Sequence, residues 1–299
     1  MLLSVPALVV AWHFDALHDL SVGSLLGGVT GLVCGVAASI LIALAMQLTN
    51  KQYNMLRSDT ALPAALFMTM LTALPTLATS FTAGMPLALI MTAAAYLLFM
   101  TFGDSLPERK IFLLFTLLSA LALTSVVYLY YLPIVLLGCV QMRIFSLKTL
   151  LAALIGIITP PWIVLGLGIV DINDIELPHL SSPSIDVSDP STLTLLAVTT
   201  IVIIAGTGFM CANVLKVYSY NSRTRAFNGY YTLLFLASVL LSIIDFNNLA
   251  VYLPLLMAMT TYQASLMFGL RISAAHSWIG IVAFMALCWT SYVWCTWIL

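Results

Sequence analysis

The sequence predicts an all-α integral membrane protein, a polytopic bundle of about ten or eleven transmembrane helices. Of its 299 residues, 62% are hydrophobic and 7% are charged, and the mean hydropathy is +1.11. A water-soluble fold cannot bury that much apolar side chain. The few charged residues stand in the connections between apolar stretches. Since one crossing takes about 20 helical residues, spans and short turns account for most of the chain.

Apolar stretches bounded by charged or turn residues are the expected spans. They are 1–14, 24–48, 61–80, 84–102, 111–128, 132–145, 149–170, 192–212, 229–244, 248–270 and 277–298. The first reaches only about 21 Å as a helix, so it thins the bilayer, tilts into the interface or lacks upstream residues. It has no basic leader and no cleavage motif, so a cleaved signal peptide is not expected. The sixth begins near Pro133 and is expected to be an interfacial hairpin or a broken helix.

The spans fall into two groups around one longer connection. Residues 1–170 are expected to form a bundle of about seven spans, and residues 192–299 four further spans. Residues 171–191 are acidic and rich in Pro and Ser, the composition of an outer loop. The whole is expected to be one continuous membrane domain. No convincing repeat relates the two groups, so an inverted-repeat transporter is not supported.

The basic residues predict the orientation, because short cytoplasmic loops retain Lys and Arg. All ten basic residues of the chain fall on alternate connections. These connections are 49–60, 103–110, 142–148, 213–228 and 270–276. If the first segment spans, the N-terminus is therefore cytoplasmic and the C-terminus lies outside.

The second span carries a stripe of small residues at every fourth position, which are Gly23, Gly27, Gly31, Gly35 and Ser39. Such a stripe allows two helix backbones to approach closely, which is how helices pack in lipid. It is expected to pack within this protein, with a dimer face as the alternative.

The first outer connection offers candidate catalytic and metal-ligating residues. His13, Asp15, His18 and Asp19 stand within seven residues near the membrane surface. The two carboxylates could supply a general base, and together with the imidazoles they could hold a divalent cation. The alternative is a hydrated turn whose charges keep it out of lipid.

Polar residues inside or at the ends of spans form a second set of candidates, because a buried polar group needs a partner or a cavity. They are Gln47, Gln141, Asn213, Asp245, Asn247, Asn248 and Gln263. Gln263 follows Thr260 and Thr261 and is expected to make interhelical hydrogen bonds or to line a pocket. Asp245 is expected in a plain turn. The span centres carry no carboxylate, which weighs against ion-coupled transport.

Known chemical motifs are missing from the sequence. It contains no phosphate-binding loop, dinucleotide fingerprint, zinc-protease motif or nucleophile elbow. All five cysteines lie in apolar stretches without a CxxC pair and are interpreted as packing residues.

Several short patterns resemble an uncharacterised family of multi-pass inner-membrane proteins of Gram-negative bacteria. They are Leu48-Thr-Asn50, Ala61-Leu-Pro-Ala-Ala65, Tyr131-Leu-Pro133, Arg143-Ile-Phe-Ser-Leu-Lys148 and Gly156-Ile-Ile-Thr-Pro160. The resemblance implies location in a bacterial inner membrane, so the C-terminus that the basic residues predict to lie outside would be periplasmic. The resemblance implies no activity.

A looser similarity is to polytopic glycosyltransferases that use polyprenyl-phosphate sugar donors. In that class an acidic motif follows the first span on the outer face, and Asp15 and Asp19 occupy the matching place. The similarity implies a scaffold that holds a lipid-linked sugar.

Three functions therefore stay open. The first is a non-enzymatic component or scaffold of cell-envelope assembly that uses the small-residue stripe or the outer loop as a contact surface. The second is a glycosyltransferase-like enzyme handling a polyprenyl-phosphate-linked sugar at the outer leaflet, and the third is a transporter or lipid flippase. The expected partners are membrane lipids, a lipid-linked sugar or an envelope complex, and no nucleic acid.

Overall fold

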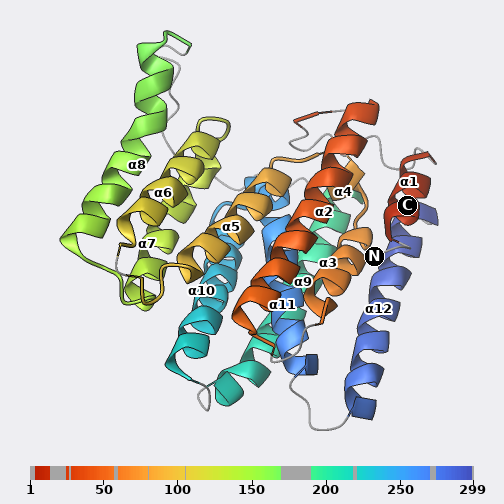
Figure 1. The fold of residues 1–299 in the computed structure, drawn as a ribbon. Coiled ribbons are helices and arrows are strands. Elements are labelled where there is room, and N and C mark those ends of the chain that lie inside the picture. The colour runs from red at the N-terminus through yellow and green to blue at the C-terminus, as the bar shows by residue number, and fades with distance from the viewer. Residues whose placement is uncertain are drawn as a thin grey trace.

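A computed structural model describes residues 4–13, 25–26, 28–56, 60–79, 81–104, 106–169, 190–217, 221–269 and 274–297, and these residues are almost entirely helical (Figure 1). The first group of helices is α1 (Ser4–His13), α2 (Gly28–Tyr53), α3 (Leu62–Thr72), α4 (Thr76–Thr79), α5 (Gly84–Phe99), α6 (Glu108–Ala122), η1 (Val126–Tyr131), α7 (Leu132–Gln141) and α8 (Leu147–Gly166). The second group is α9 (Pro190–Val217), α10 (Ser222–Ile244), η3 (Phe246–Asn248), α11 (Leu249–Gly269) and α12 (Ala274–Trp297). The predicted all-helical class is confirmed.

Five of the described helices are long and apolar enough to cross a membrane, as a helical membrane protein requires. They are α2, α8, the 192–214 part of α9, α10, and α11 with the preceding η3 turn. Shorter apolar helices occupy most of the remaining predicted stretches. The stretch 61–80 is not one helix, because Pro75 separates α3 from α4: proline lacks the N–H that continues a helix.

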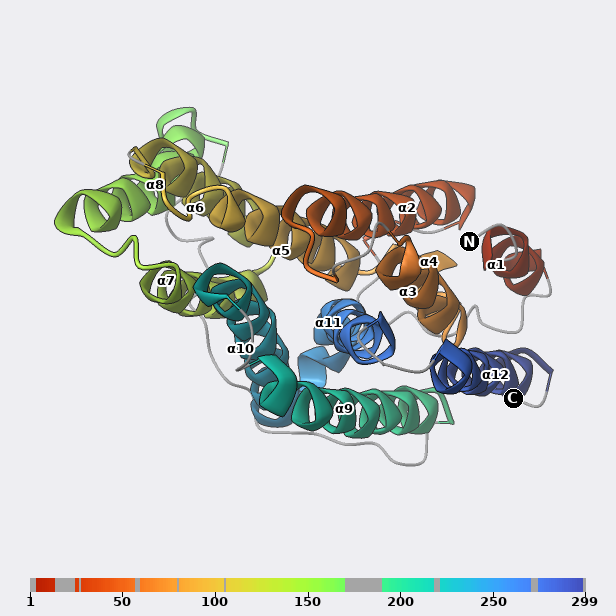
Figure 2. The ribbon, with the colours of Figure 1, turned by 60° about the horizontal axis from the view of Figure 1, so that its bottom comes forward.

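Helix α11 is the central helix of the bundle. Every residue from Leu249 to Leu266 is buried, and α3, α5, α9, α10 and α12 pack around it (Figure 2). Since α3 and α5 come from residues 1–170 and the others from residues 192–299, both groups of helices contribute to one core. The polar run from Thr260 to Gln263 therefore lies inside the protein.

The small residues of α2 pack against α4 within the protein. A Cβ atom on Gly35 would collide with the carbonyl oxygen of Ala78 and would lie 2.8 Å from its carbonyl carbon. Ser39 is fully buried, and its hydroxyl donates to the carbonyl of Gly35 (2.9 Å). A Cβ atom on Gly31 would meet the carbonyl oxygen of Thr79 at 3.4 Å. Gly35 thus makes the close backbone contact with α4 that a small-residue stripe allows, and Gly31 lies at an ordinary contact distance from α4.

Two consecutive prolines in α8 explain one of its contacts with α6. Pro160 and Pro161 stand inside α8, and Pro161 has no N–H to donate to the carbonyl of Ile157. Ser119 of α6 donates its hydroxyl to that carbonyl at 2.6 Å. A polar side chain of a neighbouring helix thus satisfies a backbone group that proline leaves free.

Most of the described basic residues gather at one end of the bundle, which we call the basic end. The ring of Tyr53 contacts Phe99 and Phe227, so α2 and α5 finish beside the start of α10. The guanidinium of Arg223 stands 5.6 Å from the Tyr53 ring. Lys110 donates to the carbonyl of Met100 (3.0 Å), which brings the start of α6 to the same place. The other described basic residues stand at or near helix ends, namely Lys51, Arg109, Arg143, Lys148, Lys216 and Arg225.

Candidate functional site

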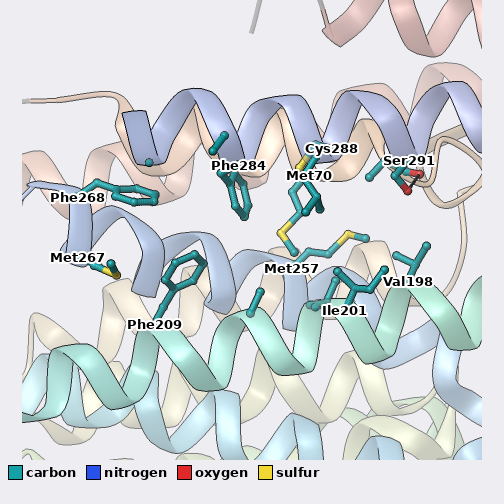
Figure 3. Close-up of a pocket in the computed structure, with 16 residues that line it drawn as sticks. Met70, Val198, Ile201, Phe209, Met257, Met267, Phe268, Phe284, Cys288 and Ser291 are labelled. Atoms are coloured by element: carbon teal, nitrogen blue, oxygen red, sulfur yellow. Dashed lines mark hydrogen bonds between the residues drawn. The ribbon is translucent and has the colours of Figure 1, made fainter. Parts of the chain in front are cut away.

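A cavity of about 400 Å³ lies between α9 and α12, with α11 and α3 behind it (Figure 3). We call it the slot. Helix α9 lines it with Val198, Ile201, Val202, Ala205 and Phe209, which share one face at helical spacing. Since Val198 and Phe209 are eleven residues apart along the helix, the slot is about 16 Å long. That length is close to half of a bilayer core of about 30 Å.

Helix α12 forms the opposite wall with a face that includes small side chains. Gly280, Ala283, Cys288 and Ser291 all line the slot. Figure 3 shows Cys288 and Ser291 on this wall, across from Val198 and Ile201. Small side chains at these positions leave room between the two helices.

The slot has a buried floor and an exposed edge. Met257 of α11 is fully buried and Met70 of α3 is 5% exposed, and both reach into the slot (Figure 3). Ile201 and Leu287, by contrast, are 48% and 53% exposed although they also line it. The slot is therefore open along one side to the apolar surface formed by α9 and α12.

Aromatic rings close the end of the slot that lies toward the basic end. The ring of Phe209 meets the ring of Phe268 at 5.7 Å and that of Phe284 at 6.1 Å between centroids. Ser291 is the only described lining residue with a side-chain oxygen or nitrogen, and its hydroxyl donates to the Ala73 carbonyl (3.3 Å). The slot thus offers carbon and sulfur surface, with flexible methionines that adapt to the shape of a bound chain.

A second, smaller cavity of about 240 Å³ lies on the other side of α9, near the basic end. We call it the polar pocket. Its polar lining consists of Asn213 of α9, Arg225, Asn228 and Thr232 of α10, and Gln263 of α11. The candidate Gln263 thus lines a pocket and also joins helices.

Hydrogen bonds in the polar pocket run from helix to helix. The Asn213 amide donates to the backbone carbonyl of Gln263 (2.7 Å) and to its Oε1 (3.1 Å). Gln263 Nε2 donates to the Thr232 hydroxyl (3.2 Å), which donates to the backbone carbonyl of Asn228 (3.0 Å). This sequence of donors and acceptors determines the orientation of the Asn213 and Gln263 amides.

Two buried atoms of the polar pocket have no hydrogen-bond partner among the described residues. They are Oδ1 of Asn213 and Nδ2 of Asn228, and each side chain is 2% exposed. The other amide atom of Asn228, Oδ1, accepts from the Tyr262 hydroxyl (3.3 Å). A buried amide group without a partner costs about 1–3 kcal/mol, so these atoms need a ligand or water.

Asp245 lies at the opposite end of α10 and is buried, at 2% exposure. Its carboxylate accepts hydrogen bonds from the Tyr252 hydroxyl (2.7 Å) and from the Asn248 amide (3.0 and 3.1 Å). The Asp245 carboxylate therefore stabilises the turn between α10 and α11 and links the two helices.

The structure does not test the other predicted site residues. Asp15, His18 and Asp19, together with Gly23 and Gly27, lie outside the described residues, and of His13 only the backbone at the end of α1 is described. Among the described residues no cluster of three or more His, Cys, Asp or Glu could hold a metal ion. The predicted divalent cation, which would use the outer connection, stays a prediction.

Sequence reasoning missed both the slot and half of the polar pocket. Arg225, Asn228, Gly229 and Thr232 stand at i, i+3, i+4 and i+7, so they share one face within the first three turns of α10, and three of them are polar. That spacing was the available signal. The slot has no comparable signal, because apolar residues at helical spacing are common to every span.

Comparison with protein-family models, with curated proteins and with solved structures finds no match for this chain.

Proposed function

We propose that this chain is a multi-pass membrane protein that binds the hydrocarbon chain of a lipid in the slot. The observation that carries the proposal is the slot itself, a 400 Å³ apolar cavity that opens sideways between two apolar helices. A cavity of this size lies within the range of about 300–1,000 Å³ that holds small ligands. An isoprenoid or acyl chain matches its apolar lining and its length of about one leaflet.

The proposed membrane placement follows from charge and exposure. Helices α8, α9 and α12 expose large apolar side chains such as Trp162 (75%), Ile204 (67%) and Ile279 (67%), which suit contact with lipid. These exposed apolar side chains support the proposal of about eleven membrane-embedded segments. The basic end is proposed to be cytoplasmic, which places the N-terminus inside. Location in a bacterial inner membrane belongs to the same proposal, on the resemblance given above.

The slot bears unequally on two of the three functions predicted from sequence. A handler of lipid-linked sugars requires a place for the lipid chain, and the slot supplies one. Catalysis by such an enzyme would depend on Asp15 and Asp19, which lie outside the described residues. The proposal therefore includes only the binding of the lipid hydrocarbon chain. A scaffold was expected to use the small-residue stripe or the outer loop. Within the stripe, Gly35 already packs against Ala78 inside the protein and Ser39 is buried.

One pair of variants tests the slot. Ala205→Trp places an indole ring into the slot, whereas Ile204→Trp puts the same ring on the adjacent position of α9, which is 67% exposed. Native mass spectrometry of the protein released from mild detergent measures bound lipid. We expect the wild type and Ile204→Trp to retain about one lipid per protein and Ala205→Trp to lose it.

The two variants also control for folding, because each adds one large ring to the same helix. Equal lipid retention by both variants, with both folded, would contradict the proposal. Retention of lipids whose headgroups differ but whose chains are alike would support recognition of the chain.

A further inference from the structure

We infer that the polar pocket binds a phosphate ester that also carries a free hydroxyl group, as a glycerophosphate headgroup does. The inference does not depend on the slot, because the polar pocket lies on the other side of α9 and has its own lining. It depends on one cation and two buried amide atoms without partners, which together suit a particular kind of ligand.

The charge of the polar pocket selects an anion. Arg225 lines the pocket, is exposed, and forms no ion pair with any described residue. The described acidic residues are Asp104, Glu108 and Asp245, and none of them lines the pocket. Arg223 stands nearby at the start of α10, so the surrounding potential is positive.

The two unpartnered amides refine this choice. Nδ2 of Asn228 is a donor and suits a phosphate oxygen, as does the Arg225 guanidinium. Oδ1 of Asn213 is an acceptor, and its orientation is determined because its Nδ2 already donates to two oxygens of Gln263. The ligand must therefore bring an acceptor and a donor together, which a phosphodiester with a hydroxyl-bearing headgroup does.

The rest of the lining fits the glycerol and chain region of such a molecule. Met210, Val214 and Val217 follow each other along one face of α9 beside the polar groups. Val214 is 38% exposed, so this side of the pocket is open at the surface of the bundle. Basic pockets between membrane helices on the cytoplasmic side are places where anionic headgroups bind.

Two charge-neutralising variants test the cation. Arg225→Gln removes the charge in the pocket, and Arg109→Gln removes a charge of the basic end that is also exposed but lies outside the pocket. The purified full-length protein is titrated with phosphatidylglycerol and, separately, with soluble glycerol 3-phosphate. We expect binding to weaken about tenfold in Arg225→Gln and to stay unchanged in Arg109→Gln.

A pair of lipids tests the acceptor without changing the protein. Phosphatidylmethanol has the phosphodiester of phosphatidylglycerol but no headgroup hydroxyl, so Asn213 Oδ1 would stay unpaired. We expect it to bind several-fold more weakly than phosphatidylglycerol. Equal affinities for the two lipids would overturn the role of Asn213.

The two titrations also identify the source of the ligand. Binding of phosphatidylglycerol that depends on Arg225 supports a lipid headgroup, and Arg225-dependent binding of glycerol 3-phosphate alone supports a soluble ester. Equal binding by the Arg225→Gln and Arg109→Gln variants, or no binding of either probe by the wild type, would overturn the inference.

Discussion

The contact between α2 and α4 predicts a large effect from adding one methyl group. A Cβ atom at position 35 would lie 2.8 Å from the carbonyl carbon of Ala78, whereas ordinary contacts begin at 3.4 Å. In Gly35→Ala the two helices must therefore separate by at least about 0.6 Å, because backbone atoms cannot rotate away as a flexible side chain can. Overpacking of this kind costs about 1–3 kcal/mol.

Gly208 provides the matched control. It also stands within a helix, but a Cβ atom there would have no heavy atom within 4 Å. Gly208→Ala should keep the helix-propensity gain of up to about 1 kcal/mol with no steric cost. Because both variants share that gain, we expect their free energies of unfolding to differ by the steric cost alone, about 1–3 kcal/mol, with Gly35→Ala the less stable.

Unfolding by a denaturing detergent, followed by circular dichroism, measures this difference. Both variants carry the same substitution, so a shared effect on the unfolded state cancels. If Gly35→Ala is as stable as Gly208→Ala, then α2 and α4 do not make the close contact described above.

Two further variants test buried hydrogen bonds. Ser119→Ala should cost about 1–3 kcal/mol, because the Ile157 carbonyl then has no donor, whereas Thr116→Ala on the same helix should be nearly neutral; thermal unfolding in detergent measures both. Asp245→Ala should destabilise the protein more than Asp245→Asn, because only asparagine keeps an acceptor for the Tyr252 hydroxyl; equal melting temperatures would contradict this.

The helical class and the positions of most helices followed from the sequence because they depend on composition and local pattern. The break at Pro75 did not, although the residue was visible, because apolar composition continues through 61–80. The end of α2 also lies at Tyr53, five residues beyond the predicted span, since a helix can continue past the apolar stretch.

The candidate sites were harder to predict because they depend on contacts between distant residues. Gln263 was identified from its polar neighbours, but its partners Asn213 and Thr232 are 50 and 31 residues away in the chain. The slot needs small residues on α12 to stand opposite α9, which no pattern within one helix reveals.

The complete burial of α11 has a consequence for how the protein is made. Of the five helices that are long enough to span a membrane, α11 has the lowest mean hydropathy. It is also the only one of the five whose apolar segment is completely buried. Contact with lipid alone therefore stabilises such a helix little after synthesis. Contact with helices that are already inserted stabilises it more. Because α3, α5, α9 and α10 are all synthesised earlier, we expect α11 to enter the membrane beside them, and truncated chains ending before α11 to show an open centre that chaperones or proteases recognise.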